Sequence, residues 1–295
     1  MKKKVLTTVF ACLMGVTLML AAGCGGSKPA ANNNAAPAQP AAEQKAESPM
    51  LDKIEKAGKI VMATDAAWAP FEYIGADGEV TGSDIELGRY IADALGVELE
   101  ILNASFDTLS TYIDSGDADM IIAAMTITEE RQETLDFSMP YTVASQYIIV
   151  PQEDDKVACV EDMAGYRIGT HLGTTGDFLV CDEIDLPEGV LHDTGATYAQ
   201  YKSLPDATVE MKNGKIDAIV CDVLLAENFC ALNPELKCFE LVYKDGSKTD
   251  EEYGIAVKKG DPLFVEAINS VIEPLLADGT LAADIVRHTE LAAEL

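Results

Sequence analysis

Basic residues are scarce in this chain. Its 295 residues include 21 Lys and Arg against 50 Asp and Glu, which gives a net charge of −29 at neutral pH. Such a negative field repels phosphate backbones and anionic membrane faces, so we expect no nucleic-acid partner. Taken alone, the charge indicates a well-solvated surface. The hydrophobic share of 48% is ordinary for a globular protein and excludes disorder throughout the chain.

The cysteines lack the spacing of a zinc site. No two of the seven stand in a CxxC pattern, so we expect no metal. Cys12 and Cys24 belong to the N-terminal segment, which leaves an odd number for the rest of the chain. We expect these to be small buried apolar residues first, and one disulfide among them second. They are Cys159, Cys181, Cys221, Cys230 and Cys238.

The first residues do not belong to the fold. A basic start at residues 2–4 precedes an apolar stretch at 5–22, and small residues then lead to Cys24. This segment resembles a lipoprotein signal peptide, residues 1–23, which implies that Cys24 is lipidated and anchors the protein on the extracytoplasmic face of the cell membrane. Cleavage would leave 18 basic and 50 acidic residues, a net charge of −32. A plain transmembrane anchor is the alternative.

The segment from Cys24 to residue 50 is rich in Ala, Asn, Pro and Gln and has no hydrophobic period. This composition predicts a flexible tether rather than a folded element. The folded part is therefore expected to begin near residue 51.

Beyond the tether, short apolar runs alternate with segments of helical period. This alternation predicts a parallel βαβ arrangement, in which ligands gather at the carboxyl ends of the strands. In the first half we expect strands at 59–65, 97–104 and 118–125 and helices at 83–96 and 106–116. The last of these strands is a continuous apolar run, which suits a strand that is covered on both faces.

A second block repeats this layout without any repeat of fixed period, so a solenoid is excluded. We expect a strand, a turn and a helix start in 166–180, helical turns around Pro205 in 197–215, a strand and then a helix in 216–229, one strand in 251–260, and a closing helix pair in 262–288. Two α/β lobes in one chain are the predicted architecture.

Six segments carry a resemblance to a known family over residues 58–290. They are "ATDAAWAPFEY", "GSDIELGRYIADALG", "SGDADMIIAAMTITEERQETLDFSMPY", "GTHLGTTGD", "NGKIDAIVCD" and "YGIAVKKGD". In this order they resemble the extracellular solute-binding proteins of polar amino acid ABC importers, such as the glutamine-binding and lysine/arginine/ornithine-binding proteins. Ser83, Met139 and the C-terminal end depart from the family's usual pattern.

The resemblance implies a periplasmic-binding-protein-like fold of type II. Each lobe is then a central, mostly parallel sheet flanked by helices, with residues 51–145 and 246–295 in lobe 1 and 146–245 in lobe 2. Two hinge strands should cross between the lobes, near residues 143–146 and between about 241 and 252. Such lobes are expected to close around a ligand.

Arg131 is the central site candidate. Thr128 is a suitable N-cap, so Arg131 should stand in the first turn of a helix just past a strand. A guanidinium holds a carboxylate with two parallel hydrogen bonds. The resemblance implies that Arg131 grips the ligand's α-carboxylate; the alternative is a solvent-facing arginine paired with Glu129, Glu130 or Glu133.

The resemblance also implies that threonines lie beside the ligand's α-carboxylate. Thr126 is expected to add its hydroxyl or backbone, and the backbone around Ala124 to accept from the α-ammonium. Thr174 and Thr175, in "LGTTG", would close over the carboxylate from the other lobe, where a helix start offers backbone N–H groups.

The ligand's basic end needs a carboxylate, since a buried unpaired cation is costly. The resemblance assigns this role to Asp222, whose alternative role is a helix N-cap. It also implies that Asp65 contacts the ligand side chain and that Trp68 and Phe106 form aromatic walls. "ATDAAWAPF" carries no Lys or Arg, so basic or amide side chains are favoured and acidic ones disfavoured.

The expected function is a substrate-binding lipoprotein that captures a free L-amino acid and delivers it to an ABC transporter permease, as a monomer without cofactor or catalytic residues. The alternative is a cyclohexadienyl (arogenate/prephenate) dehydratase-like enzyme on the same fold. That chemistry needs a cleft acid to protonate a leaving hydroxyl, and Asp65 is the residue that could be proposed for it.

Overall fold

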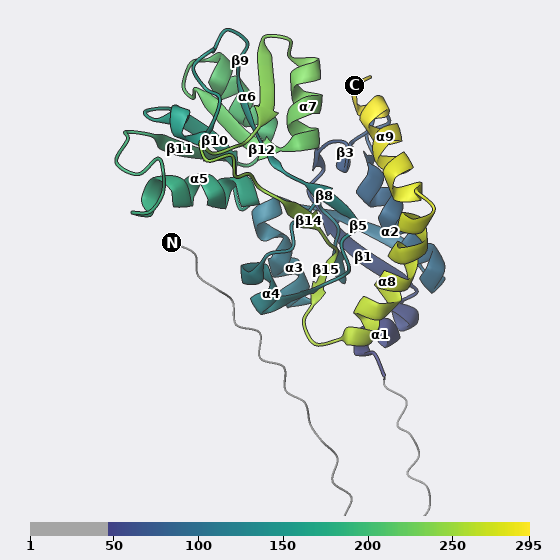
Figure 1. The fold of residues 1–295 in the computed structure, drawn as a ribbon. Coiled ribbons are helices and arrows are strands. Elements are labelled where there is room, and N and C mark those ends of the chain that lie inside the picture. Colours follow the sequence, from purple (N-terminus) through teal and green to yellow (C-terminus); the bar gives the residue numbers. More distant parts are fainter. Residues whose placement is uncertain (1–46) are drawn as a thin grey trace, which may run out of the picture. The chain divides into compact units, whose positions relative to one another are not determined.

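The computed structural model describes residues 47–295, which form one compact unit. The predicted signal peptide, the lipidated Cys24 and most of the predicted tether lie outside the described residues. The unit holds two five-stranded sheets, each flanked by helices, and two thin strands that run between them (Figure 1). We call each sheet with its helices a lobe; the division at residues 145/146 and 245/246 stays a prediction.

The first lobe is built on a sheet with the order β5-β1-β6-β15-β7. β1 (Lys59–Thr64) pairs in parallel with β5 (Glu98–Asn103) and with β6 (Met120–Ile121). β15 (Ala256–Lys258) runs antiparallel to both β6 and β7 (Leu135–Phe137). Four of the five strands therefore point the same way.

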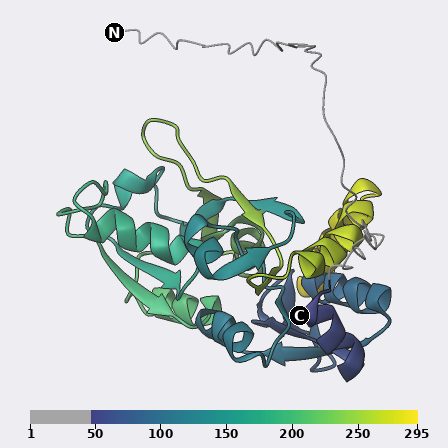
Figure 2. The same cartoon turned by 90° about the horizontal axis from the view of Figure 1, so that it is seen from below.

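Both faces of this sheet are covered, which explains its nearly continuous apolar strands. Ile60 and Met62 of β1 join one buried cluster, and Val61 and Ala63 pack with another on the opposite face. The helices of this lobe are α1 (Pro49–Ala57), α2 (Ser83–Leu95), α3 (Leu109–Ser115), α4 (Glu129–Thr134), α8 (Pro262–Ala277) and α9 (Thr280–Ala292), with a 3₁₀ turn, η1, at Phe106–Thr108. α2, α8 and α9 pack together, as Figure 2 also shows.

The second lobe repeats the plan with the order β11-β10-β12-β9-β13. β10 pairs in parallel with β11 and β12, whereas β9 runs antiparallel to β12 and β13. Its strands are β9 (Gln146–Pro151), β10 (Arg167–His171), β11 (Thr197–Tyr201), β12 (Ala218–Asp222) and β13 (Leu236–Glu240). Its helices are η2 (Val160–Met163), α5 (Thr175–Asp185), α6 (Leu204–Lys212) and α7 (Val223–Leu232).

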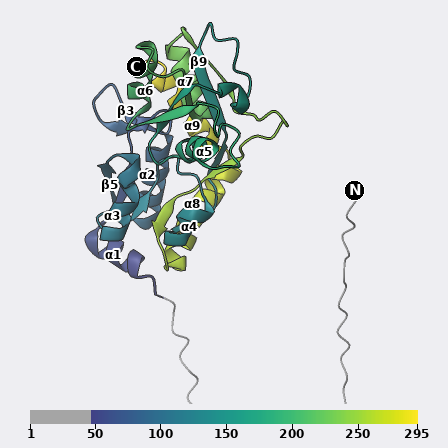
Figure 3. The same ribbon diagram turned by 90° about the vertical axis from the view of Figure 1, so that its left-hand side faces the viewer.

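Two strands connect the lobes side by side. β8 (Thr142–Ala144) leads directly into β9, and β14 (Glu251–Tyr253) returns the chain to β15. They pair antiparallel, with Glu251 opposite Ala144 and Tyr253 opposite Thr142. Figure 1 shows both strands at the junction, and Figure 3 shows the same ribbon from its left-hand side. The predicted pair of crossover strands is confirmed.

Several predicted elements are wrong in extent. The strand expected at 118–125 is ladder-paired only at β6, because the chain bends beyond Ile121 and Ala124 adopts a φ of 46°. Residues 197–215 hold β11 as well as α6, β13 was not expected, and 251–260 is two strands rather than one. A small sheet of β2 (Ala67–Trp68), β3 (Glu72–Ile74) and β4 (Val80–Thr81) was also missed.

Within residues 47–295, no helix combines the length and the apolar character needed to span a bilayer. All five cysteines of this part of the chain are free thiols. Cys159 and Cys221 are buried, as the first expectation has it, whereas Cys181, Cys230 and Cys238 are only partly buried.

Candidate functional site

Arg131 turns inward between the lobes. The hydroxyl of Thr128 caps α4 by accepting from the Arg131 backbone N–H at 3.1 Å, which fixes Arg131 in the first turn of the helix. Its guanidinium donates to the backbone oxygen of Thr126 at 2.7 Å and to that of Gly173, in the other lobe, at 3.1 Å. It also lies 5.4 Å from the centre of the Phe106 ring. The alternative of a solvent-facing arginine is wrong.

The guanidinium stands beside a narrow cavity that both lobes enclose. The cavity has a volume of about 10 Å³, roughly the space of one water molecule. Besides Arg131, its wall contains seven more of the nine predicted residues and one that was not predicted, Ala123. The wall is formed by Trp68, Phe106, Ala123, Ala124, Thr126, Arg131, Thr174, Thr175 and Asp222.

Asp65 is the predicted residue that does not line this cavity. Its carboxylate accepts from the Phe106 backbone N–H at 2.9 Å and faces Nε2 of His171 at 3.6 Å. Burial raises the pKa of Asp65 to about 6. The carboxylate therefore lies at the base of the Phe106 wall rather than on the cavity surface.

Asp222 ends β12 and is buried at the cavity. It occupies the N-cap position of α7, but its side chain makes no capping bond. It accepts instead from Nε2 of Gln146 at 2.5 Å and from the hydroxyl of Tyr253. Burial, followed by the nearby Glu251 carboxylate, raises its pKa to about 7.

Two polar residues at the junction, Glu251 of β14 and Gln146 at the start of β9, were missed by the sequence reasoning. Glu251 of β14 accepts from the hydroxyls of Thr126 at 2.7 Å and Thr175 at 2.9 Å, and from Nε2 of Gln146 at 2.9 Å. A single carboxylate thus joins a threonine of each lobe. Both residues lie on strands at predicted crossings, which is the signal that could have identified them.

His171 was missed as well. It is the last residue of β10, and its side chain is 1% exposed. Its ring lies 5.1 Å from that of Trp68 and 6.2 Å from that of Phe106. Its position at a strand's carboxyl end, two residues before the glycine of "GTT", was the available signal.

Taken together, a guanidinium and a carboxylate face one cavity from the two lobes. A comparison with known families then assigns the chain. The model of the bacterial extracellular solute-binding proteins, family 3, matches residues 60–288. The chain belongs to this family. As a family 3 solute-binding protein it is a binding protein rather than an enzyme.

Curated relatives of this solute-binding protein bind several amino acids. A probable histidine-binding protein of Neisseria gonorrhoeae is 32% identical over 224 residues, covering 75% of this chain and 80% of that protein. ABC transporter arginine-binding protein 1 of Escherichia coli is 30% identical over 224 residues, covering 76% and 88%. The L-cystine-binding protein TcyJ of Escherichia coli is 27% identical over 239 residues, covering 81% and 85%.

Solved structures show the same fold. The substrate-binding protein AbpA of Streptococcus pneumoniae, bound to L-arginine, has 31% identity and a TM-score of 0.75, covering 83% of this chain and all of that one. A mutant of ArgBP from T. maritima has 35% identity and a TM-score of 0.72, covering 82% and 99%. The type II binding-protein fold is confirmed.

A buried pair of carboxyl groups, Asp84 and Glu72, supports the cavity wall of this solute-binding protein. Asp84, at the start of α2, accepts from the Ala124 backbone N–H at 2.8 Å and from the Tyr141 hydroxyl at 2.7 Å. This holds Ala124 in its left-handed conformation. Burial raises the pKa of Asp84 to about 6, and burial followed by the Asp84 charge raises the pKa of the fully buried Glu72 well above its usual value.

The N-terminus of α5 is built to present its backbone to the cavity. Thr174 caps the helix by accepting from the Asp177 N–H at 3.3 Å, and Gly173 adopts a φ of 82° in the preceding turn. Asp177 is buried and accepts from the Gly173 N–H and the Thr170 hydroxyl. This arrangement fixes Thr175 at the cavity rim.

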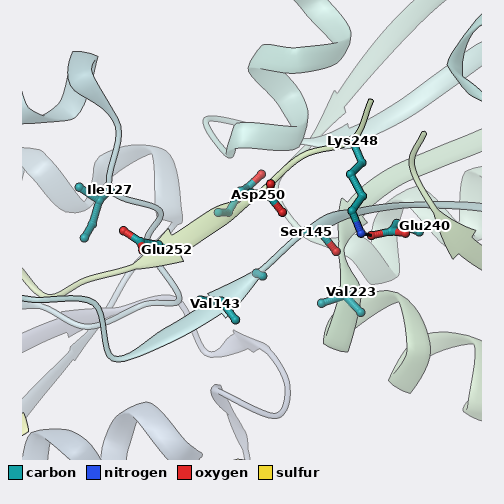
Figure 4. A pocket seen from close by; sticks show the side chains of 10 residues that line it. Ile127, Val143, Ser145, Val223, Glu240, Lys248, Asp250 and Glu252 are labelled. Carbon is teal, nitrogen blue, oxygen red and sulfur yellow. Dashed lines mark hydrogen bonds and ion pairs between the residues drawn. The ribbon is translucent and has the colours of Figure 1, made fainter. Parts of the chain in front are cut away.

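A second, larger hollow lies along the linking strands (Figure 4). It has a volume of about 610 Å³, and its wall includes Val143, Ser145, Lys248, Asp250 and Glu252. Glu251 and Glu252 both line this hollow, and the Glu251 carboxylate also bonds to the threonines of the smaller cavity. Neither Arg131 nor Asp222 reaches it, so the site chemistry belongs to the smaller cavity. No group of side chains in residues 47–295 has the composition of a metal site.

Proposed function

We propose that this solute-binding protein captures a free L-amino acid between its lobes and delivers it to the permease of an ABC importer. The observation that carries the proposal is that Arg131 and Asp222 face one interlobe cavity. The guanidinium would hold the α-carboxylate, and Asp222 would hold the α-ammonium. The relatives named as amino acid-binding proteins support this assignment.

The wall residues support the rest of the ligand assignment. Thr126, Thr174 and Thr175 would donate to the carboxylate, and the backbone at Ala124 would accept from the ammonium. Trp68 and Phe106 would cover the aliphatic part of the ligand side chain, with Asp65 at its end. This favours basic or amide side chains over acidic ones.

Binding requires the lobes to separate. A cavity of about 10 Å³ is far smaller than any amino acid, so the walls must part before a ligand enters. The linking strands β8 and β14 are the natural hinge, since they carry the chain between the lobes. Micromolar affinity corresponds to about 8 kcal/mol, which contacts from both lobes would supply together.

The partner and location follow from the family and the N-terminal pattern. We propose that Cys24 carries the lipid that keeps the protein at the outer face of the membrane, near its permease. Mass spectrometry of membrane-extracted protein tests this: a diacylated or triacylated Cys24 at the N-terminus is the expected species.

A calorimetric screen against the twenty amino acids tests the proposal. Wild type should bind basic or amide ligands, and Arg131→Ala should bind them at least about a hundredfold more weakly, since two charge-assisted bonds of about 1.5 to 3 kcal/mol each are lost. Arg89→Ala is the matched control, because Arg89 is exposed and pairs with Glu86 on α2. Unchanged affinity in Arg131→Ala would refute the assignment.

A further inference from the structure

Asp65 lies beside a group of three rings. Trp68 and Phe106 belong to the first lobe, whereas the His171 ring comes from the second and is tilted against them, with its centre 5.1 and 6.2 Å from theirs. Nε2 of His171 lies 3.6 Å from the Asp65 carboxylate, so this pair is itself a contact between the lobes. Aromatic faces around a carboxylate form a favourable environment for a cation.

The imidazole has unused hydrogen-bonding capacity. His171 is almost fully buried; the Lys202 backbone interacts with the ring, Nδ1 makes no close hydrogen bond to the described residues, and Nε2 faces Asp65 at 3.6 Å, beyond hydrogen-bond distance. A buried polar atom without a partner is costly, so a group that enters this region and bonds to the ring is favoured. As a neutral ring, imidazole offers one accepting nitrogen.

The charges that face the ring are mainly acidic. Asp65 at the end of β1, Asp107 in η1 and Asp177 in α5 all act on His171, and the guanidinium of Arg131 lies beyond the Phe106 ring. Burial nevertheless lowers the pKa of His171, so the ring is neutral at pH 7. A second anion at this end of the site would meet the same acids and be repelled.

We propose that His171 sets the charge selectivity of the site at its side-chain end. In the neutral state the ring accepts a hydrogen bond from a cationic ligand side chain that Asp65 holds. In the protonated state the ring is itself the cation beside Asp65, and it excludes the ligand's charge. This inference rests on the proposed function and adds that a guanidinium or ammonium side chain binds in competition with a proton.

Arginine and citrulline form a matched pair of probes, because they differ in a guanidinium against an uncharged ureido group. Titration calorimetry of the full-length protein at about pH 8 and about pH 5 should show arginine affinity falling about tenfold more than citrulline affinity. His171→Gln keeps a polar group near Nε2 but cannot take up the proton, so its arginine affinity should fall less. The fall that remains reports Asp222, which acts on both probes, and Asp65, whose carboxylate also takes up a proton in this range. His192→Gln is the control, because the His192 ring contacts the Ile184 backbone oxygen and the exposed Asp193 rather than Asp65.

Proton NMR of wild type gives a second readout that does not depend on a variant's folding. The chain has three histidines, so the His171 ring can be assigned by comparison with His171→Gln. Saturating arginine should lower the pKa of His171, and citrulline should leave it near the ligand-free value. Binding of both probes with identical pH profiles and an unmoved His171 pKa would overturn this inference alone. Failure of every amino acid to bind would overturn the proposed function along with it.

Discussion

Glu251→Gln tests how the contacts between the lobes affect ligand binding. Glu251 is the one carboxylate that accepts from Thr126, Thr175 and Gln146 at 2.7 to 2.9 Å. The bond to Thr175 reaches into the second lobe, so we expect it to break when the lobes separate. Glutamine has nearly the same shape, so the substitution removes the charge while keeping an accepting oxygen.

The size of the effect follows from the bonds. A hydrogen bond to a charged group contributes about 1.5 to 3 kcal/mol, against about 0.5 to 1.5 kcal/mol for a neutral one. After the substitution, the three bonds to residue 251 would together contribute about 3 kcal/mol less. Removing Glu251 also relieves its repulsion of Asp222, which offsets part of this loss. A net loss of about 2 kcal/mol corresponds to about thirtyfold weaker ligand binding.

Calorimetry with the best ligand of the amino acid screen measures this loss, and its pH dependence gives a separate signature. In wild type, ligand affinity should fall as the pH drops through about 7, where Asp222 takes up a proton. Without the Glu251 charge the pKa of Asp222 should be lower, so the fall should move to lower pH. Glu252→Gln is the matched control, because Glu252 is exposed on the same strand. Equal losses in both variants, or wild-type affinity in Glu251→Gln, would refute the reasoning.

The remaining predictions concern the buried carboxyls. Glu72→Gln should change the free energy of unfolding by less than about 1 kcal/mol, because burial raises the pKa of Glu72 and so favours the uncharged form, which an amide of the same size replaces. Glu72→Ala should cost clearly more by leaving a cavity, and chemical denaturation compares the two variants. Thermal stability should fall by several degrees between about pH 5 and about pH 8, which calorimetry of the ligand-free protein measures. The pKa values of Asp65 and Asp84 are raised to about 6 and that of Asp222 to about 7, so the folded state holds protons that the unfolded chain releases near pH 4. The stability that these bound protons contribute is complete below the unfolded pKa and is lost as the pH rises through 6 to 7. Burial lowers the pKa values of His171 and His288, so their protonation at the low end of this pH range destabilises the folded protein. A steady rise in melting temperature from pH 5 to 8 would show that the histidines outweigh the carboxyl groups and would contradict the prediction.

Much of this architecture could be predicted from local patterns. The apolar runs at 59–65 and 97–104 became β1 and β5, and glycine marked the end of α2, where Gly96 adopts a φ of 70°. The N-cap at Thr128 was also predictable, because capping depends on residues three positions apart. These features need no knowledge of distant contacts.

The failures share a physical cause, which is tertiary contact. The run at 118–125 is apolar throughout, yet the Asp84 carboxylate holds the Ala124 N–H and turns the chain out of the ladder. Asp84 is 40 residues away in sequence, so no local pattern reveals this bond. β13 was missed because its residues "LKCFE" pair only with β9, 85 positions earlier at the Leu236–Pro151 register pair.

The site residues divide in the same way. Arg131, Asp222 and the threonines follow strand ends or cap helices, so their positions and the family resemblance identify them together. Gln146 and Glu251 act by bonding to each other and to residues of both lobes. Glu251 lies 105 residues from its partner Gln146 and 125 residues from its partner Thr126. Only the fold shows that these two side chains meet Asp222.

The contacts between the lobes have a consequence for affinity. Arg131 bonds to Gly173 and Glu251 bonds to Thr175 across the junction, so the closed form is stabilised by the protein's own groups. A ligand shifts the balance between open and closed forms only by the difference in its interaction with each. If it takes over the guanidinium of Arg131, its net gain is reduced by the bond to Gly173 that it replaces. Weakening an interlobe contact that the ligand leaves in place should therefore reduce affinity, as we expect for Glu251→Gln. Weakening a contact that the ligand displaces should raise affinity, as we expect for His171→Gln at low pH.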